Sequence, residues 1–393
     1  MDHFESSTKR RQLDTFDSLN SDIPFEVLSR LPTKCLPGMK CVSKAWHRLI
    51  SDRTFVKVQM QSQKREPVSG FLVQQRYQYC EDDIKTISYI PVETEGDELK
   101  QTIFNFLPEE VALLTSCNGL VCCRSCLPFQ VPSLYICNPL NHQWIRLAWD
   151  EPDKEHSFAL AFDPSQDLTD TSTNFKLVRV QKSETGLFSS CFSFEVYSSN
   201  SRAWMKSTEV CQCNDDLYKN KGIFIGGVLH WLTDGDEILT FKVESELSWL
   251  VSTPLPVMEI NSIPAVCIGE CDSRLHYVMV SDYGVHVWLL EDYYESKWSL
   301  KLSKSLDEMQ EEYSYFSVLR AIAPQWQAVN HIPWMDPLAF KDGYLLMRVS
   351  LRIFLYDIEL NKTKDVCAVS ELGNNSTYFP TVLPYTLSLV PLN

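Results

Sequence analysis

The sequence has no apolar segment long enough to place it in a membrane or to direct its export. Its 393 residues contain no run of about 18 apolar residues, the length that an α-helix needs to cross a bilayer. The N-terminal stretch is polar and mixed in charge, so we expect no secretory signal. Without export, the 14 cysteines are expected to be free thiols in a reducing compartment, which predicts a cytoplasmic or nuclear protein.

The chain is also short of basic residues. Lys and Arg number 36 against 51 Asp and Glu, which gives a formal net charge of −15. Proteins that bind nucleic acid carry basic stripes, so this composition argues against a nucleic-acid partner. Catalytic signatures are absent too, since there is no P-loop, no Gly-x-Gly-x-x-Gly, no Gly-x-Ser-x-Gly elbow and no His-Glu-x-x-His. We therefore expect a protein that is not an enzyme and needs no cofactor.

Metal ligands at recognised spacings are scarce. Cys123 and Cys126 have a zinc-like spacing, but no second pair at a matching spacing follows them. Strand alternation would also send Cys122 and Cys123 to opposite faces, and residues 211–213 lie far away along the chain. The acidic run at residues 234–237 suits a hairpin turn better than a calcium loop. The sequence therefore predicts core thiols and no metal site.

Residues 19–60 are patterned for a small all-α unit of three short helices, after a tail at residues 1–18 that we expect to be disordered. Asp22 and Pro24 suit the start of a first helix, and Pro32 ends it. The apolar face of that helix is formed by Ile23, Val27, Leu28 and Leu31. About forty residues bury too little apolar surface to be stable alone, so we expect a partner to cover part of this unit.

The pattern of residues changes from helical spacing to short β-forming runs after a polar connector at residues 61–69. Residues 70–393 contain short β-branched and aromatic runs punctuated by Asn, Asp, Gly and Pro. Strand–turn–strand units, such as residues 134–147, recur about every 45–65 residues, which is typical of four-stranded propeller blades. We predict a mostly-β domain of about six blades, with a sandwich or open sheet as the alternative. Residues 381–392 are expected to close the ring by pairing with an N-terminal strand of this domain.

The helical unit resembles an F-box of the plant F-box families. The resemblance rests on Leu31-Pro32, Val42-Ser43-Lys44-Ala45-Trp46 and Leu49-Ile50-Ser51 at these spacings. It implies docking on the Skp-type adaptor of a cullin-RING (SCF) ubiquitin ligase. By position, the docking residues would be Leu19, Ile23, Val27, Leu28, Leu31, Pro32, Val42 and Trp46. The alternative for any one of them is a place in the core of the helical unit.

The β domain is similar to the F-box-associated, kelch-like domain of the same plant proteins. Ser116-Cys-Asn-Gly-Leu120, Asn138-Pro139 followed by Trp144, and Phe158 to Asp163 carry this resemblance. It implies a substrate receptor that binds a target protein for ubiquitination and degradation. Asn20 and Pro37-Gly38 depart from the F-box pattern and predict weaker adaptor binding. The alternatives are an interaction scaffold without ligase coupling and a propeller hydrolase.

A target site is expected on loops at one rim of the ring, because loops vary without disturbing the blades. The irregular segment at residues 313–337 is rich in aromatic residues, which suits a protein interface. The predicted target-binding residues are Tyr313, Tyr315, Phe316, Trp326, His331 and Trp334. The alternative is that this segment packs on its own propeller.

Overall fold

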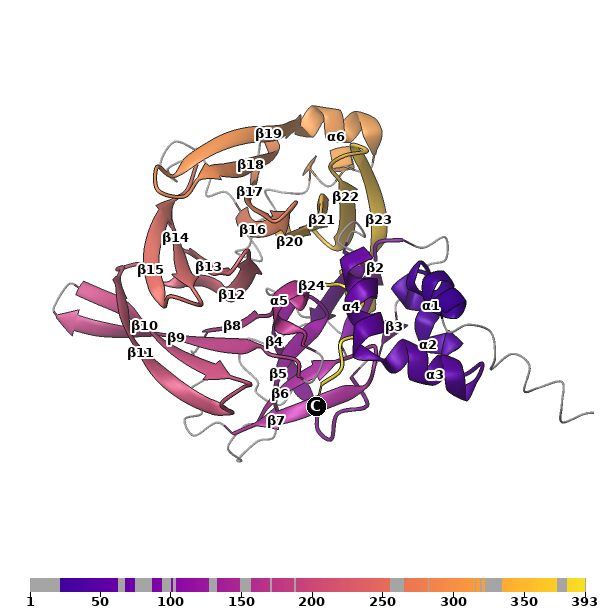
Figure 1. Cartoon of the computed structure of the whole chain (residues 1–393). Coiled ribbons are helices and arrows are strands. Elements are labelled where there is room, and N and C mark those ends of the chain that lie inside the picture. Colours follow the sequence, from indigo (N-terminus) through magenta and orange to yellow (C-terminus); the bar gives the residue numbers. More distant parts are fainter. Residues whose placement is uncertain are drawn as a thin grey trace, which may run out of the picture.

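A computed structural model shows helices at the N-terminus and sheets arranged around a common centre (Figure 1). It describes residues 22–62, 68–74, 87–93, 100–101, 104–126, 133–148, 157–169, 172–186, 189–254, 265–281, 283–314, 316–318, 320–321, 334–372 and 380–392. In this part of the chain, no helix combines the length and apolar character that crossing a membrane requires.

The helical unit begins with α1 (Asp22–Ser29), followed by η1 (Thr33–Cys35) and α2 (Leu36–Met39). Ser43 caps α3 (Lys44–Ser51), because its Oγ accepts a hydrogen bond of 3.1 Å from the Trp46 amide. Asp52 starts α4 (Arg53–Ser62) in the same way, with its Oδ1 accepting from the Thr54 amide at 2.9 Å. The helix α4 was not predicted, and it extends into the expected connector.

The remaining chain forms four hydrogen-bonded sheets in the described residues. The first four-stranded sheet comprises β24 (Thr381–Tyr385), β1 (Gly70–Gln74), β2 (Ser88–Pro91) and β3 (Lys100–Gln101). The second four-stranded sheet comprises β4 (Val111–Cys117), β5 (Leu120–Ser125), β6 (Leu134–Asn138) and β7 (Gln143–Leu147). One eight-stranded sheet comprises β8 (Ser157–Ala161), β9 (Lys176–Gly186), β10 (Ser189–Ser198), β11 (Ala203–Gln212), β12 (Leu217–Ile225), β13 (Val228–Thr233), β14 (Glu237–Lys242) and β15 (Leu247–Ser252). The other comprises β16 (Ala265–Cys271), β17 (Arg274–Ser281), β18 (Gly284–Asp292), β19 (Lys297–Ser305), β20 (Met335–Lys341), β21 (Tyr344–Val349), β22 (Arg352–Asp357) and β23 (Lys362–Ala368). Short helices α5 (Pro164–Asp167), α6 (Leu306–Glu312) and η4 (Val369–Leu372) lie in the connections.

Each eight-stranded sheet consists of two antiparallel four-stranded meanders joined through their innermost strands. The joining pairs are parallel, with Lys221 of β12 opposite Phe158 of β8 and Gly269 of β16 opposite Phe340 of β20. Gly269 permits this approach, because a Cβ there would overlap the Phe340 carbonyl oxygen. The meanders surround a common centre, so the domain is propeller-like (Figure 1).

The ring closes as the sequence predicted. Strand β24 near the C-terminus pairs antiparallel with β1, with Gly70 opposite Tyr385 and Gln74 opposite Thr381. The hairpin expected at residues 134–147 is also confirmed, because β6 pairs with β7 over that range.

Recurring tryptophans lie in the outer strands of the meanders. Trp144, Trp204, Trp249 and Trp298 lie in β7, β11, β15 and β19, the outermost strands of successive meanders. Trp204 Nε1 donates to the Ala148 carbonyl at 3.0 Å, and Trp298 Nε1 donates to the Ser252 carbonyl at 2.8 Å. Both acceptors lie at the end of the preceding outer strand, so these indoles link neighbouring meanders.

Candidate protein-interaction surfaces

Three aliphatic side chains of the helical unit are exposed to solvent. Ile23 and Val27 of α1 are 57% and 56% exposed, and Val42 before α3 is 62% exposed. Ile23 and Val27 are one helical turn apart and therefore share a face. Leu28 points the other way and is buried, and Phe25 packs edge-to-face on Phe55 of α4 at 5.3 Å between ring centroids. The structure thus separates a core face of α1 from an exposed apolar face.

The other predicted adaptor residues are placed differently. Leu31 and Trp46 are half-buried against the core, and Pro32 is exposed. Leu19 lies outside the described residues. Pro37 stands in the first turn of α2, which has a single turn, so the hydrogen-bond loss expected for a proline inside a helix does not arise. A Cβ on Gly38 would meet no atom within 4 Å.

The helical unit shares a hydrophobic core with the β domain. One contiguous cluster, here called the shared core, joins the helical unit, sheet β4–β7, strands β8 and β9 and the C-terminal segment. Its members from the helices are Leu28, Leu36, Ile50, Phe55 and Val56, and those from the C-terminal segment are Leu389, Val390 and Leu392. Arg53 Nη1 also donates to Thr173 Oγ1 at 3.1 Å, and Thr173 Oγ1 donates to the Pro391 carbonyl. The helices are therefore packed on the sheets rather than joined only by a connector.

The motif residues of the β domain hold the C-terminal segment in this junction. The buried Asn138 side chain donates from Nδ2 to the carbonyls of Ser388 and Val390, at 2.9 and 2.7 Å. Gly119 has φ +88°, and a Cβ there would overlap Ser388, so glycine is required for two separate reasons. Asn118 Nδ2 donates to the Phe162 carbonyl at 2.7 Å. The sequence marked these residues, but their partners are visible only in the fold.

The helical unit lies on the rim of the ring that is made of tight turns. This turn rim contains Asn118–Gly119, Gly226–Gly227, Asp272–Ser273 and Asp342–Gly343, each with positive φ angles. A pocket of about 320 Å³ lies between these turns and Met60–Gln61 at the end of α4.

In an antiparallel meander, the hairpin between the second and third strands lies at the opposite end of the sheet. That opposite rim, here called the loop rim, contains the described hairpins at residues 234–236 and 350–351 and the connection at residues 213–216.

The predicted target-binding aromatics lie mainly beneath the surface where they are described. Phe316 and Trp334 are buried, and Phe316 packs on Phe354 of β22 with ring centroids 5.1 Å apart. Tyr313 donates to Asp365 Oδ2 at 2.9 Å and packs edge-to-face on the same Phe354. Tyr315, Trp326 and His331 lie outside the described residues. The contacts of the three described residues support packing on the propeller, and their role in target binding stays a prediction.

The clustered cysteines of sheet β4–β7 behave as core thiols. Cys122 and Cys123 enter different hydrophobic clusters on opposite faces of β5, as strand alternation predicted. Burial raises the pKa of the Cys117 thiol to about 12 and holds that of Cys122 well above its ordinary value. These two thiols are therefore protonated at neutral pH.

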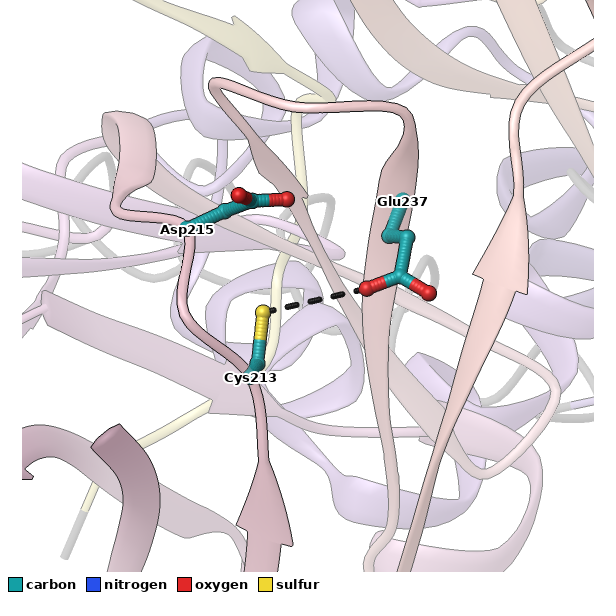
Figure 2. Close-up of side chains that lie close together, drawn as sticks. All are labelled: Cys213, Asp215 and Glu237. Atoms are coloured by element: carbon teal, nitrogen blue, oxygen red, sulfur yellow. Dashed lines mark hydrogen bonds between the residues drawn. The ribbon is translucent and has the colours of Figure 1, made fainter. Parts of the chain in front are cut away.

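A different group of possible metal ligands converges at the loop rim (Figure 2). Cys213 and Asp215 lie between β11 and β12, and Glu237 is the first residue of β14. One ligand atom from each lies within 4.8 Å of the others. Burial, and then the charge of Asp215, raises the pKa of the Glu237 carboxyl. The hairpin expected at residues 234–237 is present, but its approach to Cys213 could not be read from the spacing.

Comparison with known proteins identifies both parts of the chain. Residues 16–57 match the F-box domain, and residues 63–321 match the family described as F-box protein At3g26010-like, beta-propeller. The F-box protein At5g49610 of Arabidopsis thaliana is 28% identical over 298 residues, which cover 72% of this chain and 78% of that protein. The F-box protein At5g07610 of the same plant is 25% identical over 312 residues, covering 73% of this chain and 70% of that protein. Among solved structures, TolB from Acinetobacter baumannii aligns with a TM-score of 0.42 at 10% identity, covering 88% of this chain and 71% of that one.

An F-box domain implies binding of a Skp-type adaptor, and F-box proteins are typically adaptors without catalytic activity. The exposed aliphatic residues Ile23, Val27 and Val42 lie within the matched F-box residues. The match to the propeller family covers more than half of the chain. This chain is therefore an F-box protein whose C-terminal part belongs to the At3g26010-like β-propeller family.

Proposed function

We propose that this chain is the substrate-recognition subunit of an SCF-type ubiquitin ligase. Its F-box would bind the Skp-type adaptor, and its propeller would hold a target protein for ubiquitination. The chain would contribute no chemistry of its own, because the ligase scaffold raises the effective concentration of the conjugating enzyme near the target. The observation that carries the proposal is the exposed aliphatic face of α1 in the F-box, formed by Ile23 and Val27.

The arrangement of the two rims supports this division of labour. The F-box packs on the turn rim through the shared core, so the loop rim lies on the opposite side of the ring from the F-box. Loops tolerate sequence change better than tight turns with positive φ, and a target site belongs on the more variable surface. We assign target binding to the loop rim. Buried thiols such as Cys117 and Cys122 fit a reducing compartment, so we propose that this activity takes place in the cytoplasm or nucleus.

We also infer six blades. Each four-stranded sheet would be one blade, and each eight-stranded sheet would be two blades joined by a parallel pair of inner strands. Blade one would combine β24 with β1–β3 and so use both ends of the domain, which is a common way to close a propeller ring.

The experiment that tests the function is a binding measurement between the full chain and a plant Skp-type adaptor. We expect the double variant Ile23→Asp, Val27→Asp to weaken adaptor binding by at least about 100-fold, because two apolar contacts would become buried charges. Both side chains are exposed, so the variant should unfold at the same temperature as the wild type. Leu31 and Trp46 are less suitable positions, because both are half-buried against the shared core.

The matched control is Leu360→Asp, which places the same charge on an exposed aliphatic residue of the propeller. Adaptor affinity of this variant should equal that of the wild type. A wild-type chain that does not bind the adaptor would favour the interaction scaffold without ligase coupling. Equal binding by wild type and double variant would reject the assigned surface.

A further inference from the structure

Three side chains from two neighbouring meanders point toward one another at the loop rim. Figure 2 shows Cys213 and Asp215, from the connection between β11 and β12, facing Glu237 at the start of β14. Their ligand atoms lie within 4.8 Å of one another. Among the described residues, this is the group of His, Cys, Asp and Glu side chains that converges in this way. The backbone brings the group together across the boundary between two meanders of one sheet.

The charge of this group is not balanced by a basic side chain. Neither Asp215 nor Glu237 forms an ion pair with Lys or Arg in the described part of the chain. Lys182 is the nearby cation, but its Nζ binds the backbone carbonyls of Asn214 and Asp215 and the carboxylate of Asp216. Two half-buried carboxylates beside a buried cysteine therefore face one another without a counter-charge, an arrangement that a cation would stabilise.

The types of ligand atom, one sulfur and two carboxylates, indicate which cation would bind. Magnesium and calcium prefer oxygen ligands alone, whereas zinc accepts both thiolate and carboxylate. Around tetrahedral zinc, a sulfur at about 2.3 Å and an oxygen at about 2.0 Å from the metal lie roughly 3.5 Å apart. Cys213 Sγ and Glu237 Oε2 are 3.9 Å apart, so a shift of a few tenths of an ångström would bring them to that separation.

The local backbone keeps the carboxylates close to the thiol. Gly235 lies in the hairpin bend beneath Asp215, and a Cβ there would overlap Asp215 Oδ2. Thr233 Oγ1 donates to the Glu237 carbonyl at 2.7 Å and fixes the start of β14. The three ligands are therefore held on backbone that is already ordered, which lowers the entropy cost of binding a metal.

We propose that Cys213, Asp215 and Glu237 bind one zinc ion, with water at the fourth position. The ion would link the connection between β11 and β12 to the hairpin between β13 and β14, and so fix part of the loop rim. This site is independent of adaptor binding by the F-box and does not rest on the proposed ligase function.

The test uses the full-length protein, stripped of metal by a chelator and then titrated with Zn²⁺ and, separately, with Co²⁺. We expect one zinc ion per chain after dialysis and a Co²⁺ absorption spectrum with tetrahedral and thiolate charge-transfer bands. Cys213→Ser should abolish the charge-transfer band. Glu237→Gln should lower zinc affinity by more than the ~10–100-fold loss typical when a residue that only hydrogen-bonds to a metal ligand is changed.

The matched control is Cys211→Ser, two residues earlier, where the buried thiol is hydrogen-bonded to Ser248 instead. It should bind Zn²⁺ and Co²⁺ like the wild type, and so should Cys41→Ser on the exposed surface of the helical unit. Circular dichroism of each apo variant establishes that it is folded. A wild type without stoichiometric zinc, or a Co²⁺ thiolate band that survives Cys213→Ser, would overturn the proposal.

Discussion

His230 on β13 is a buried histidine with one identified side-chain partner. Its ring is fully buried, and Nε2 lies 2.9 Å from the Tyr293 hydroxyl. Burial lowers the pKa of His230 to about 4, so the ring is neutral at physiological pH. A buried, neutral ring beside the Tyr293 hydroxyl indicates a structural role for His230.

This burial predicts a pH-dependent loss of stability. Between pH 6.5 and pH 4 the unfolded chain binds a proton at His230 that the folded chain does not, so the free energy of unfolding falls as pH falls. Above pH 6.5 the ring is neutral in both the folded and the unfolded chain, and the free energy of unfolding has its full value. The loss approaches about 3 kcal/mol as the pH falls to 4. Denaturant unfolding of His230→Gln across this range should show a shallower decline than the wild type. Parallel curves would contradict the assignment, because the other titrating groups are common to both proteins.

At the scale of elements, one turn holds the C-terminal segment. The Asn138-Pro139-Leu140-Asn141 turn joins β6 to β7, and Asn141 Nδ2 adds a hydrogen bond of 2.8 Å to the Leu389 carbonyl. The segment thereby satisfies its backbone carbonyls although it forms no strand beyond Tyr385. The turn thus joins the end of the chain to the sheet on which the F-box packs.

Removing the Asn138 side-chain amide should show how much this attachment contributes to the free energy of unfolding. We expect Asn138→Ala to lower the free energy of unfolding by about 1–3 kcal/mol, because the carbonyls of Ser388 and Val390 would lose a buried donor. Asn200→Ala is the matched control, since Asn200 is exposed in the turn between β10 and β11. Its effect should stay within about 0.5 kcal/mol. Chemical denaturation of the three proteins measures both values, and equal losses would reject the role of the Asn138 amide.

At the scale of the whole molecule, the F-box and the propeller form one packed body. Phe55 and Val56 of α4 are buried in the same cluster as Leu389 and Val390 from the chain's other end. An F-box held in this way positions the loop rim at a defined orientation relative to a bound adaptor.

A cavity in the shared core should loosen this attachment. Phe55→Ala is expected to cost about 3–5 kcal/mol of stability and to raise hydrogen exchange in α1–α4. Val58→Ala, on the exposed side of the same helix, should leave exchange unchanged. In calorimetry the wild type should unfold in one transition. If the wild-type F-box melted separately from the propeller, the shared core would not be a cooperative unit.

The sequence by itself determined the features that depend on neighbouring residues. Alternating apolar residues and turn-forming residues predicted the hairpin β6–β7, because pleat and turn chemistry act within a few residues. The F-box and propeller family were equally readable from local motifs. The short helix α4 was missed, since its stability comes from packing on the sheets rather than from its own residues.

Only the tertiary structure decided the contacts between distant residues. Asn138 meets carbonyls some 250 positions away, Phe55 meets the C-terminal segment, and Glu237 meets Cys213 across two meanders. The predicted adaptor residues likewise divided into exposed and buried sets only once α1 was packed on α4. A motif shows that a side chain is suited to a role, but its burial and its long-range partners arise from how the sheets and helices pack, which no local pattern records.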